Sequence, residues 1–222
     1  MTDRRLGWLL LAPALALLGG LTIYPAVWVI WLSLQYRIPV FSISRWAGLA
    51  HYAFLAVDTR FWNAAAVTAV FTVASVALEG GLGLAMALGL RGQRHGRRAA
   101  VALLCYARLL TIPGELYEAA EVDGAAGVQA FARITWPLVR PILLVALLFR
   151  TLDALRAFDL MFVLTGGGPA GTTETLTVYA YRALFQTLQV GFGSAIGVVV
   201  FALVMVVAVA YLRMIHRQEA SV

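Results

Sequence analysis

The sequence predicts an all-α protein, a polytopic helical membrane protein with about four full spans, a short partial helix and a helical segment at the cytoplasmic surface. Of the 222 residues, 62% are hydrophobic and only 13% are charged, and the mean hydropathy is +0.85. A soluble domain usually carries about a quarter charged residues. The basic residues stand in short clusters beside apolar runs, which is typical of membrane topology and not of nucleic-acid binding. We therefore expect residues 1–222 to form a single domain that contacts membrane lipid and no nucleic acid.

The first predicted span covers residues 6–34, which carry no charge. This run is long enough to cross about 30 Å of hydrocarbon. Arg4 and Arg5 precede it, and Pro13 and Pro25 are expected to kink it. A cleaved signal peptide, with a cleavage site at residues 14–16, is the alternative, but the apolar run is longer than a signal sequence. Residues 35–60 are predicted to be a mixed, aromatic-containing loop.

The second predicted span covers residues 61–90 and is interrupted only by Glu79. A dense basic loop, residues 91–98, follows, and the positive-inside rule places it in the cytoplasm. The next apolar run is too short to span, so we expect residues 99–112 to form a non-spanning or partly inserted helix. Glycines at positions 80, 81 and 83 are small enough to permit close helix packing.

The third predicted span covers residues 141–164 and is ended by a glycine-rich turn at residues 166–169. Residues 172–190 are semi-polar, and the last span covers residues 192–215. Its end is basic, with Arg213, His216 and Arg217. Because arginines cluster at both termini and at residues 91–98, both termini are predicted to be cytoplasmic.

One short segment gathers four of the eleven acidic residues: Glu115, Glu118, Glu121 and Asp123. Good helix formers are followed by Gly124, which tolerates a left-handed turn, so a helix is predicted to bend or stop there. A second helix is expected to start near Ala126 and to end at Pro137. The segment is therefore either a helix–glycine–helix projection that meets a basic partner or a solvated loop.

The spacing of this segment resembles a family motif. Glu118-Ala119-Ala120, Gly124, Ile134 and Pro137 are similar to the E-A-A-x3-G-x9-I-x-L-P motif of binding-protein-dependent ABC importer permeases, with Trp136 in place of the leucine. The sequences at 12–13, 24–25 and 31–34, and those at 149–154, 158–159 and 164–169, also resemble the carbohydrate-type permeases (maltose, trehalose and glycerol-phosphate-like). The chain is thus identified as a member of that family, a multi-pass protein of the bacterial cytoplasmic membrane.

The resemblance implies a function for this projection, residues 113–137: it is the coupling helix that docks on an ATP-binding subunit. The coupling residues it implies are Glu118, Ala119, Ala120, Asp123, Gly124, Ile134 and Pro137. The implied partners are a second permease subunit, an ATP-binding subunit dimer, an extracytoplasmic solute-binding protein and a sugar substrate. ATP hydrolysis would then belong to a separate subunit, with no cofactor in this chain.

The chain departs from the family in length. Carbohydrate-type permeases usually have six core helices and are longer by several tens of residues, whereas here the basic loop runs almost directly into the motif. The end of one helix, an outer loop and most of the next helix are missing from the pattern. A natural deletion, a faulty gene prediction and a reduced functional variant all fit this pattern, so a truncated membrane scaffold that binds partners without transport is the alternative function.

Charged residues inside the predicted spans are candidates for the translocation path. Arg150, Asp153, Arg156 and Asp159 alternate in sign at i, i+3 spacing, so neighbours can pair along the helix. Charge in hydrocarbon is costly, so these side chains and Glu79 are expected to face other helices or water. The row either lines the path or forms structural ion pairs, and an interhelical partner is expected for Glu79.

An enzyme is a poor interpretation of this sequence. The three histidines are scattered with no H-E-x-x-H, Ser194 lacks a G-x-S-x-G elbow, and no lysine follows the glycine-rich stretch at 166–173. The single cysteine, Cys105, cannot form an internal disulfide, and no spacing suggests a metal site. We therefore predict no catalytic residue and no metal ligand.

Overall fold

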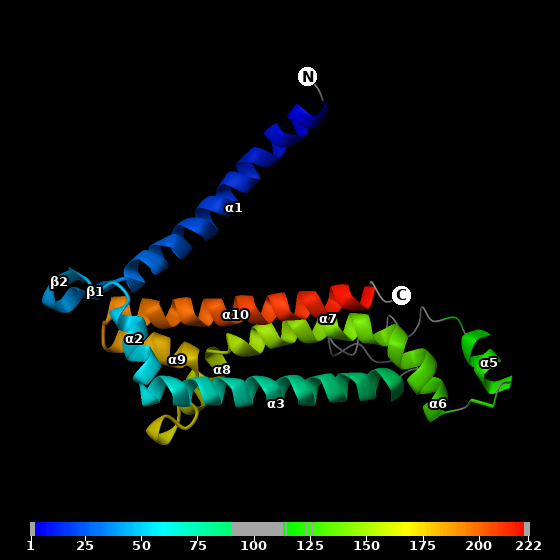
Figure 1. Ribbon diagram of the computed structural model, residues 1–222. Helices are drawn as coiled ribbons and strands as arrows, with labels where there is room; N and C mark the ends of the chain where they lie inside the picture. The colour runs from blue at the N-terminus through cyan, green and yellow to red at the C-terminus, as the bar shows by residue number, and fades with distance from the viewer. Residues whose placement is uncertain (1–2, 90–112, 114, 123, 126, 220–222) are drawn as a thin grey trace. The chain divides into compact units, whose positions relative to one another are not determined.

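The computed structural model describes residues 3–89, 113, 115–122, 124–125 and 127–219. The chain forms two compact units, one of Met1–Val67 with Phe158–Ala202 and one of Thr68–Ala157 with Leu203–Val222. Within the described residues three helical stretches are long and apolar enough to cross a membrane: Leu11–Ser33, Thr59–Met86 and Val190–Arg217. They coincide with three of the four predicted spans (Figure 1). The basic loop and the partial helix predicted at residues 91–112 lie outside the described residues.

Helix α1 (Asp3–Ser33) is one continuous helix that contains both prolines. The prediction of a loop after it was wrong. Residues 35–60 contain an antiparallel hairpin, β1 (Gln35–Ile38) and β2 (Ile43–Trp46), whose register pairs Gln35 with Trp46. A 3₁₀ turn (η1, Pro39–Phe41) and the left-handed Ser42 close the hairpin, and α2 (Ala50–Val57) follows. QYRI alternates polar residues with an aromatic and a β-branched one, and ISRW begins with a β-branched and ends with an aromatic residue, which are residue types enriched in strands.

Helix α3 (Thr59–Gly89) is the second span, and its first part belongs to the core of the first unit. Leu55 and Phe61 pack there with Leu176, Tyr179 and Ile196, all of which are buried. Apolar contact of this kind holds together α2, the start of α3, α9 (Leu176–Tyr181) and the start of α10 (Val190–Glu219).

The third predicted span is not a single helix. Helix α7 (Trp136–Leu155) ends before residue 156, and α8 (Asp159–Thr165) starts after a short break. The break is stabilised by Arg156, whose backbone N–H bonds to Asp153 O while its side-chain Nε donates to Leu152 O at 3.1 Å. In a continuing helix, Leu152 O would accept a hydrogen bond from a backbone N–H. Here the arginine side chain supplies that bond, as capping groups do at helix C-termini.

The predicted glycine-rich turn is confirmed at the end of α8. Gly166, Gly167 and Gly168 all have positive φ values, between 57° and 90°, a region where residues with a Cβ are strained. A 3₁₀ turn (η4, Pro169–Gly171), α9 and a π-helical turn (η5, Arg182–Gln186) lead from there to α10. The last predicted span is confirmed as α10, which contains the apolar stretch Val190–Arg217.

Candidate functional site

The acidic segment forms the helix α5 (Glu115–Val122), none of whose side chains is buried. Ala125 N–H bonds to Ala120 O at 2.8 Å, and Gly124 follows the helix with φ +71° and open space where a Cβ would stand. This is the predicted bend at a glycine. After the bend, α6 (Val128–Ala130) begins the second helix. The segment is therefore a helix–turn–helix with an exposed first helix.

The predicted end of the second helix at Pro137 was wrong, because the chain stays helical from α6 into α7. A π-helical turn (η3, Phe131–Thr135) precedes the proline, and Trp136 N–H bonds to Phe131 O, five residues back. Proline cannot donate the usual helical bond and clashes with the preceding turn. The wider π turn accommodates this defect, so α6 and α7 are one helical path with a local irregularity.

The residues for which the sequence predicted a coupling role differ in their exposure. Glu118, Ala119, Gly124 and Pro137 are exposed, whereas Ala120 and Ile134 are half-buried. Asp123 lies outside the described residues. Tyr117 Oη lies 2.8 Å from Thr135 Oγ1, which ties α5 to the turn that carries Ile134.

The surface of α5 is both acidic and apolar. It carries three carboxylates, Glu115, Glu118 and Glu121, none of which forms an ion pair among the described residues. Beside them Leu116 and Val122 are exposed, Val122 by 88%. The first helix of this segment therefore exposes unpaired acid beside bare apolar side chains.

The charged residues of the helices form two separate pairs. In the second unit, Arg150 of α7 makes an ion pair with Glu79 of α3. Arg150 Nε lies 2.5 Å from Glu79 Oε2, but the N–H is not aligned for a hydrogen bond. Its Nη2 donates to Ser75 Oγ at 2.8 Å, and Ser75 Oγ donates to Glu79 at 3.2 Å. The interhelical partner expected for Glu79 is thus Arg150.

Asp153 pairs with Arg156 at 3.5 Å, and both side chains are mostly exposed. This is one of the i, i+3 pairs that the sequence predicted, whereas Arg150 does not pair with Asp153. Asp159 stands in the first turn of α8, where a carboxylate interacts favourably with the helix dipole. Because α7 ends between Asp153 and Asp159, the four charges do not form a continuous row along one helix.

An apolar cavity of about 410 Å³ lies in the second unit, next to the Arg150 network. It is bounded by α3, α7 and Tyr211 of α10. Tyr211 Oη lies 3.0 Å from Thr151 Oγ1, whereas the buried Thr72 hydroxyl has no hydrogen-bond partner among the residues that the structure describes. Gly80 lines the same wall, and a Cβ at its position would stand 2.9 Å from Leu147 Cδ2, so this glycine permits the close packing predicted for it.

A third charged cluster was missed by sequence reasoning. In the first unit, Glu174 is 1% exposed and lies between two arginines. Arg60 donates to both of its oxygens, each at 2.8 Å, and Arg182 Nη1 donates to Oε1 at 2.8 Å. Arg182 Nη2 also donates to Gly166 O. The cluster fastens the start of α3 and the π turn after α9 to the glycine-rich turn.

The surroundings of this cluster are polar and well bonded. Asn63 Nδ2 donates to Gly171 O at 2.9 Å, and Tyr179 Oη donates to Asp58 Oδ2 at 2.6 Å. Burial, followed by the bond to Asp58, raises the pKa of the Tyr179 phenol, so the hydroxyl stays protonated as a donor. One signal in the sequence pointed here: Glu174 is the only acidic residue between positions 160 and 218.

These features define the class: an all-α membrane protein with long apolar helices and an exposed acidic helix–turn–helix. Residues 99–219 match the family described as binding-protein-dependent transport system inner membrane component. The chain belongs to this family, and the membership that the sequence predicted is confirmed.

Two of the relatives are similar over nearly the whole chain, and a third is similar over about half of it. The trehalose transport system permease protein SugA of Mycobacterium tuberculosis is 31% identical, over 96% of this chain and 90% of its own. The trehalose/maltose transport system permease protein MalF of Thermococcus litoralis is also 31% identical, over 95% of this chain and 94% of its own. The sulfoquinovosyl glycerol transport system permease protein SmoG of Agrobacterium fabrum is 48% identical over 119 residues, 54% of this chain and 39% of its own.

The alignment with SugA runs over 277 positions, whereas this chain has 222 residues. At least 55 aligned positions of SugA therefore have no counterpart here, which agrees with the shortening predicted from the sequence. A crystal structure of a bacterial ABC transporter that imports the acidic polysaccharide alginate has the same fold, with a TM-score of 0.70, 19% identity and coverage of 97% of each chain.

The Glu79–Arg150 pair leads to a prediction. Glu79→Leu and Arg150→Leu should each lower the yield of folded protein, because each leaves a partly exposed charge without its partner on an apolar helix, and the double variant should recover part of the loss. Because both side chains are partly exposed, we expect an interaction energy of about 0.5–1 kcal/mol from this cycle. The measurement is thermal unfolding and monodisperse yield in detergent.

The matched control for this cycle is the pair Arg150→Leu and Asp153→Leu, which should show additive losses because these two side chains are not paired. If Arg150 and Asp153 show coupling instead, the pairing with Glu79 does not hold in the membrane-extracted protein.

Proposed function

We propose that this chain is the membrane-spanning permease subunit of an ATP-driven ABC importer and that it translocates a sugar or related solute delivered by a binding protein. The observation that carries the proposal is the exposed α5–Gly124–α6 turn, which carries Glu118, Ala119, Ala120 and Gly124 of the family's motif. The sugar is proposed because relatives that cover nearly the whole chain are named trehalose and maltose permeases.

The proposed mechanism is alternating access. ATP-driven closure of a dimer of separate ATP-binding subunits moves the docked segment 113–137, and the helices joined to it rock. The continuous helical path from α6 through the π turn into α7 supports this, because a displacement of the docked turn passes into α7 without a flexible loop. The Glu79–Arg150 pair between α3 and α7 is proposed as a polar element of the translocation path, together with Asp153, Arg156 and Asp159.

The test is uptake by the assembled system. The chain is produced together with its ATP-binding subunit, a second permease subunit and a solute-binding protein, and uptake of labelled trehalose and maltose into proteoliposomes is measured with and without ATP. We expect ATP-dependent uptake of one of these or of a related solute. ATP-dependent uptake must also disappear when the solute-binding protein is left out.

A truncated scaffold is the second candidate, because at least 55 positions of SugA have no counterpart in this chain. Such a scaffold would co-purify with its partners and still give no uptake of any solute that the binding protein recognises. That combination of results would replace the transport proposal.

The proposed topology makes a separate prediction: both termini and residues 91–98 face the cytoplasm. Single cysteines at Arg4, Gln93 and Gln218, in a Cys105→Ser background, should resist an impermeant thiol reagent in intact cells. A cysteine at Thr172, which is exposed just after the 3₁₀ turn η4, is the positive control and should be labelled. External labelling at any of the first three positions would disprove this orientation.

A further inference from the structure

The segment that joins the first two spans, residues 34–57, has an unusual composition. It contains no acidic residue, two arginines (Arg37 and Arg45) and several aromatic side chains. Many of its large apolar side chains are exposed, among them Phe41 by 71% and Trp46 by 61%. A loop exposed to water would normally carry polar turn residues. The exposed aromatic and arginine side chains of residues 34–57 therefore suggest a contact surface for a partner that accepts both apolar and cationic groups.

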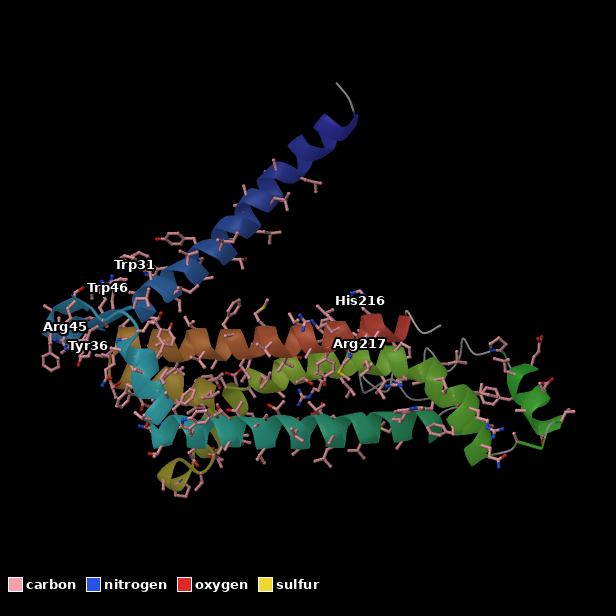
Figure 2. The ribbon with its side chains drawn as sticks, viewed as in Figure 1. Trp31, Tyr36, Arg45, Trp46, His216 and Arg217 are labelled. Atoms are coloured by element: carbon pink, nitrogen blue, oxygen red, sulfur yellow. The ribbon has the colours of Figure 1, made fainter. Side chains whose placement is uncertain are left out.

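The hairpin brings these groups together beside the end of α1. The register places Tyr36 opposite Arg45, whose guanidinium lies 4.6 Å from the centre of the tyrosine ring. The Trp46 ring lies 5.5 Å from that of Trp31, which belongs to the last turn of α1. Figure 2 shows these four side chains gathered around the hairpin and the adjoining helix end.

The hairpin is held rigidly at this place. Ala47 and Gly48 N–H groups both bond to Leu34 O, the residue that follows α1. His51 Nε2 lies 3.1 Å from Gln35 O, and its ring stacks on Tyr36 at 5.9 Å. The base of the hairpin, from which Val40 and Phe41 extend, is therefore attached to the end of the membrane-spanning helix.

The position at a helix end points to one occupant. Trp31 stands two residues before the end of an apolar stretch, Leu11–Ser33, that is long enough to cross a membrane. Tryptophan and tyrosine concentrate where a spanning helix leaves the hydrocarbon, because their rings are apolar and their N–H or O–H groups are polar. Arginine at the same level binds lipid phosphate, and Arg37 has no acidic partner among the described residues.

We propose that the β1–β2 hairpin is a membrane-interface anchor: Val40 and Phe41 insert at the boundary of the hydrocarbon, and Arg37 and Arg45 bind lipid phosphate groups. Continuity with α1 and the complete lack of acid in residues 34–57 favour lipid over a protein partner. The anchor would fix the tilt and depth of α1. It requires only that α1 spans the membrane and does not depend on which solute is carried.

The test places a nitroxide spin label on single cysteines in the full chain with Cys105→Ser. The protein is reconstituted in vesicles of equimolar phosphatidylcholine and phosphatidylglycerol. Collisions with oxygen, which concentrates in hydrocarbon, are compared with collisions with a water-soluble nickel chelate. The labelled position is Phe41→Cys, with Val40→Cys as the second variant if the first does not fold. The control is Thr172→Cys, which is exposed elsewhere in the same unit.

We expect the Phe41 label to favour oxygen and the Thr172 label to favour nickel. Replacing Arg37 and Arg45 by glutamine should weaken the attraction to the anionic surface by about fivefold per arginine, which moves the Phe41 label toward the nickel value. Arg213→Gln with Arg217→Gln, at the end of α10, should leave the Phe41 label unchanged.

Two results would overturn the proposal. If the Phe41 label collides with nickel as readily as the Thr172 label does, then Phe41 lies in water. The hairpin would in that case be a surface for a soluble partner such as a binding protein. A label that neither reagent reaches is covered by protein, which would make this face an interface with a second copy of the chain.

Discussion

Replacing Glu174 by glutamine is expected to destabilise the folded chain by about 3 kcal/mol, since breaking a buried ion pair leaves its partner charge unsatisfied. Glu174 is almost completely buried and accepts three hydrogen bonds, from Arg60 and Arg182. A glutamine would turn an N–H group toward at least one guanidinium and would leave two positive charges without a counter-charge. Because Arg60 is half-exposed, part of this cost is relieved by solvent, and the value lies at the lower end of the range for buried pairs.

The measurement is the loss of folded protein during heating in detergent, followed by size-exclusion chromatography. Asp153→Asn is the matched control, because it removes a carboxylate from an ion pair that is mostly exposed on both sides. Exposed pairs contribute about 0–1 kcal/mol, so this variant should behave like the parent protein. Equal losses of stability at Glu174 and Asp153 would show that the buried cluster stabilises the fold no more than an exposed ion pair does.

Replacing Gly124 by proline is expected to abolish association with the ATP-binding subunit. Gly124 has φ +71°, whereas the proline ring fixes φ near −65°, so the bend between α5 and α6 cannot form as it stands. The variant keeps all the apolar helices, and its yield in the membrane should stay normal. The expected result is loss of co-purified ATP-binding subunit and loss of uptake.

The charge reversal Glu118→Lys tests the same contact without altering the backbone. Glu118 is exposed and forms no ion pair among the described residues, so the change should not affect folding. If a basic partner residue faces it, attraction becomes repulsion and costs about 2–5 kcal/mol of binding. Glu115→Lys, on the same helix but outside the motif, is the control and should have a smaller effect. Normal recovery of the ATP-binding subunit with both Gly124→Pro and Glu118→Lys would exclude this segment as the docking element.

Much of the fold follows from the sequence, because it depends on local composition. Long apolar runs bounded by arginine predict the helices that begin near residues 6, 61 and 192, and the structure confirms all three. The bend at Gly124 and the turn at Gly166 also follow from local chemistry, since glycine is the residue that adopts positive φ without strain. The motif at 118–137, recognised by its spacing, was enough to predict the family.

Only the tertiary structure decided how the charges pair and where the helices are interrupted. Glu174 and Arg60 are 114 positions apart in the sequence. For Arg150 the sequence allowed more than one carboxylate as the partner, and only the structure identified Glu79. The break at Arg156 depends on a side chain that bonds back to Leu152 O, and the passage through Pro137 depends on the π turn before it. The hairpin at 35–46 is also beyond the sequence pattern, because short strands form only when pairing and packing against a helix end compensate the cost of ordering them.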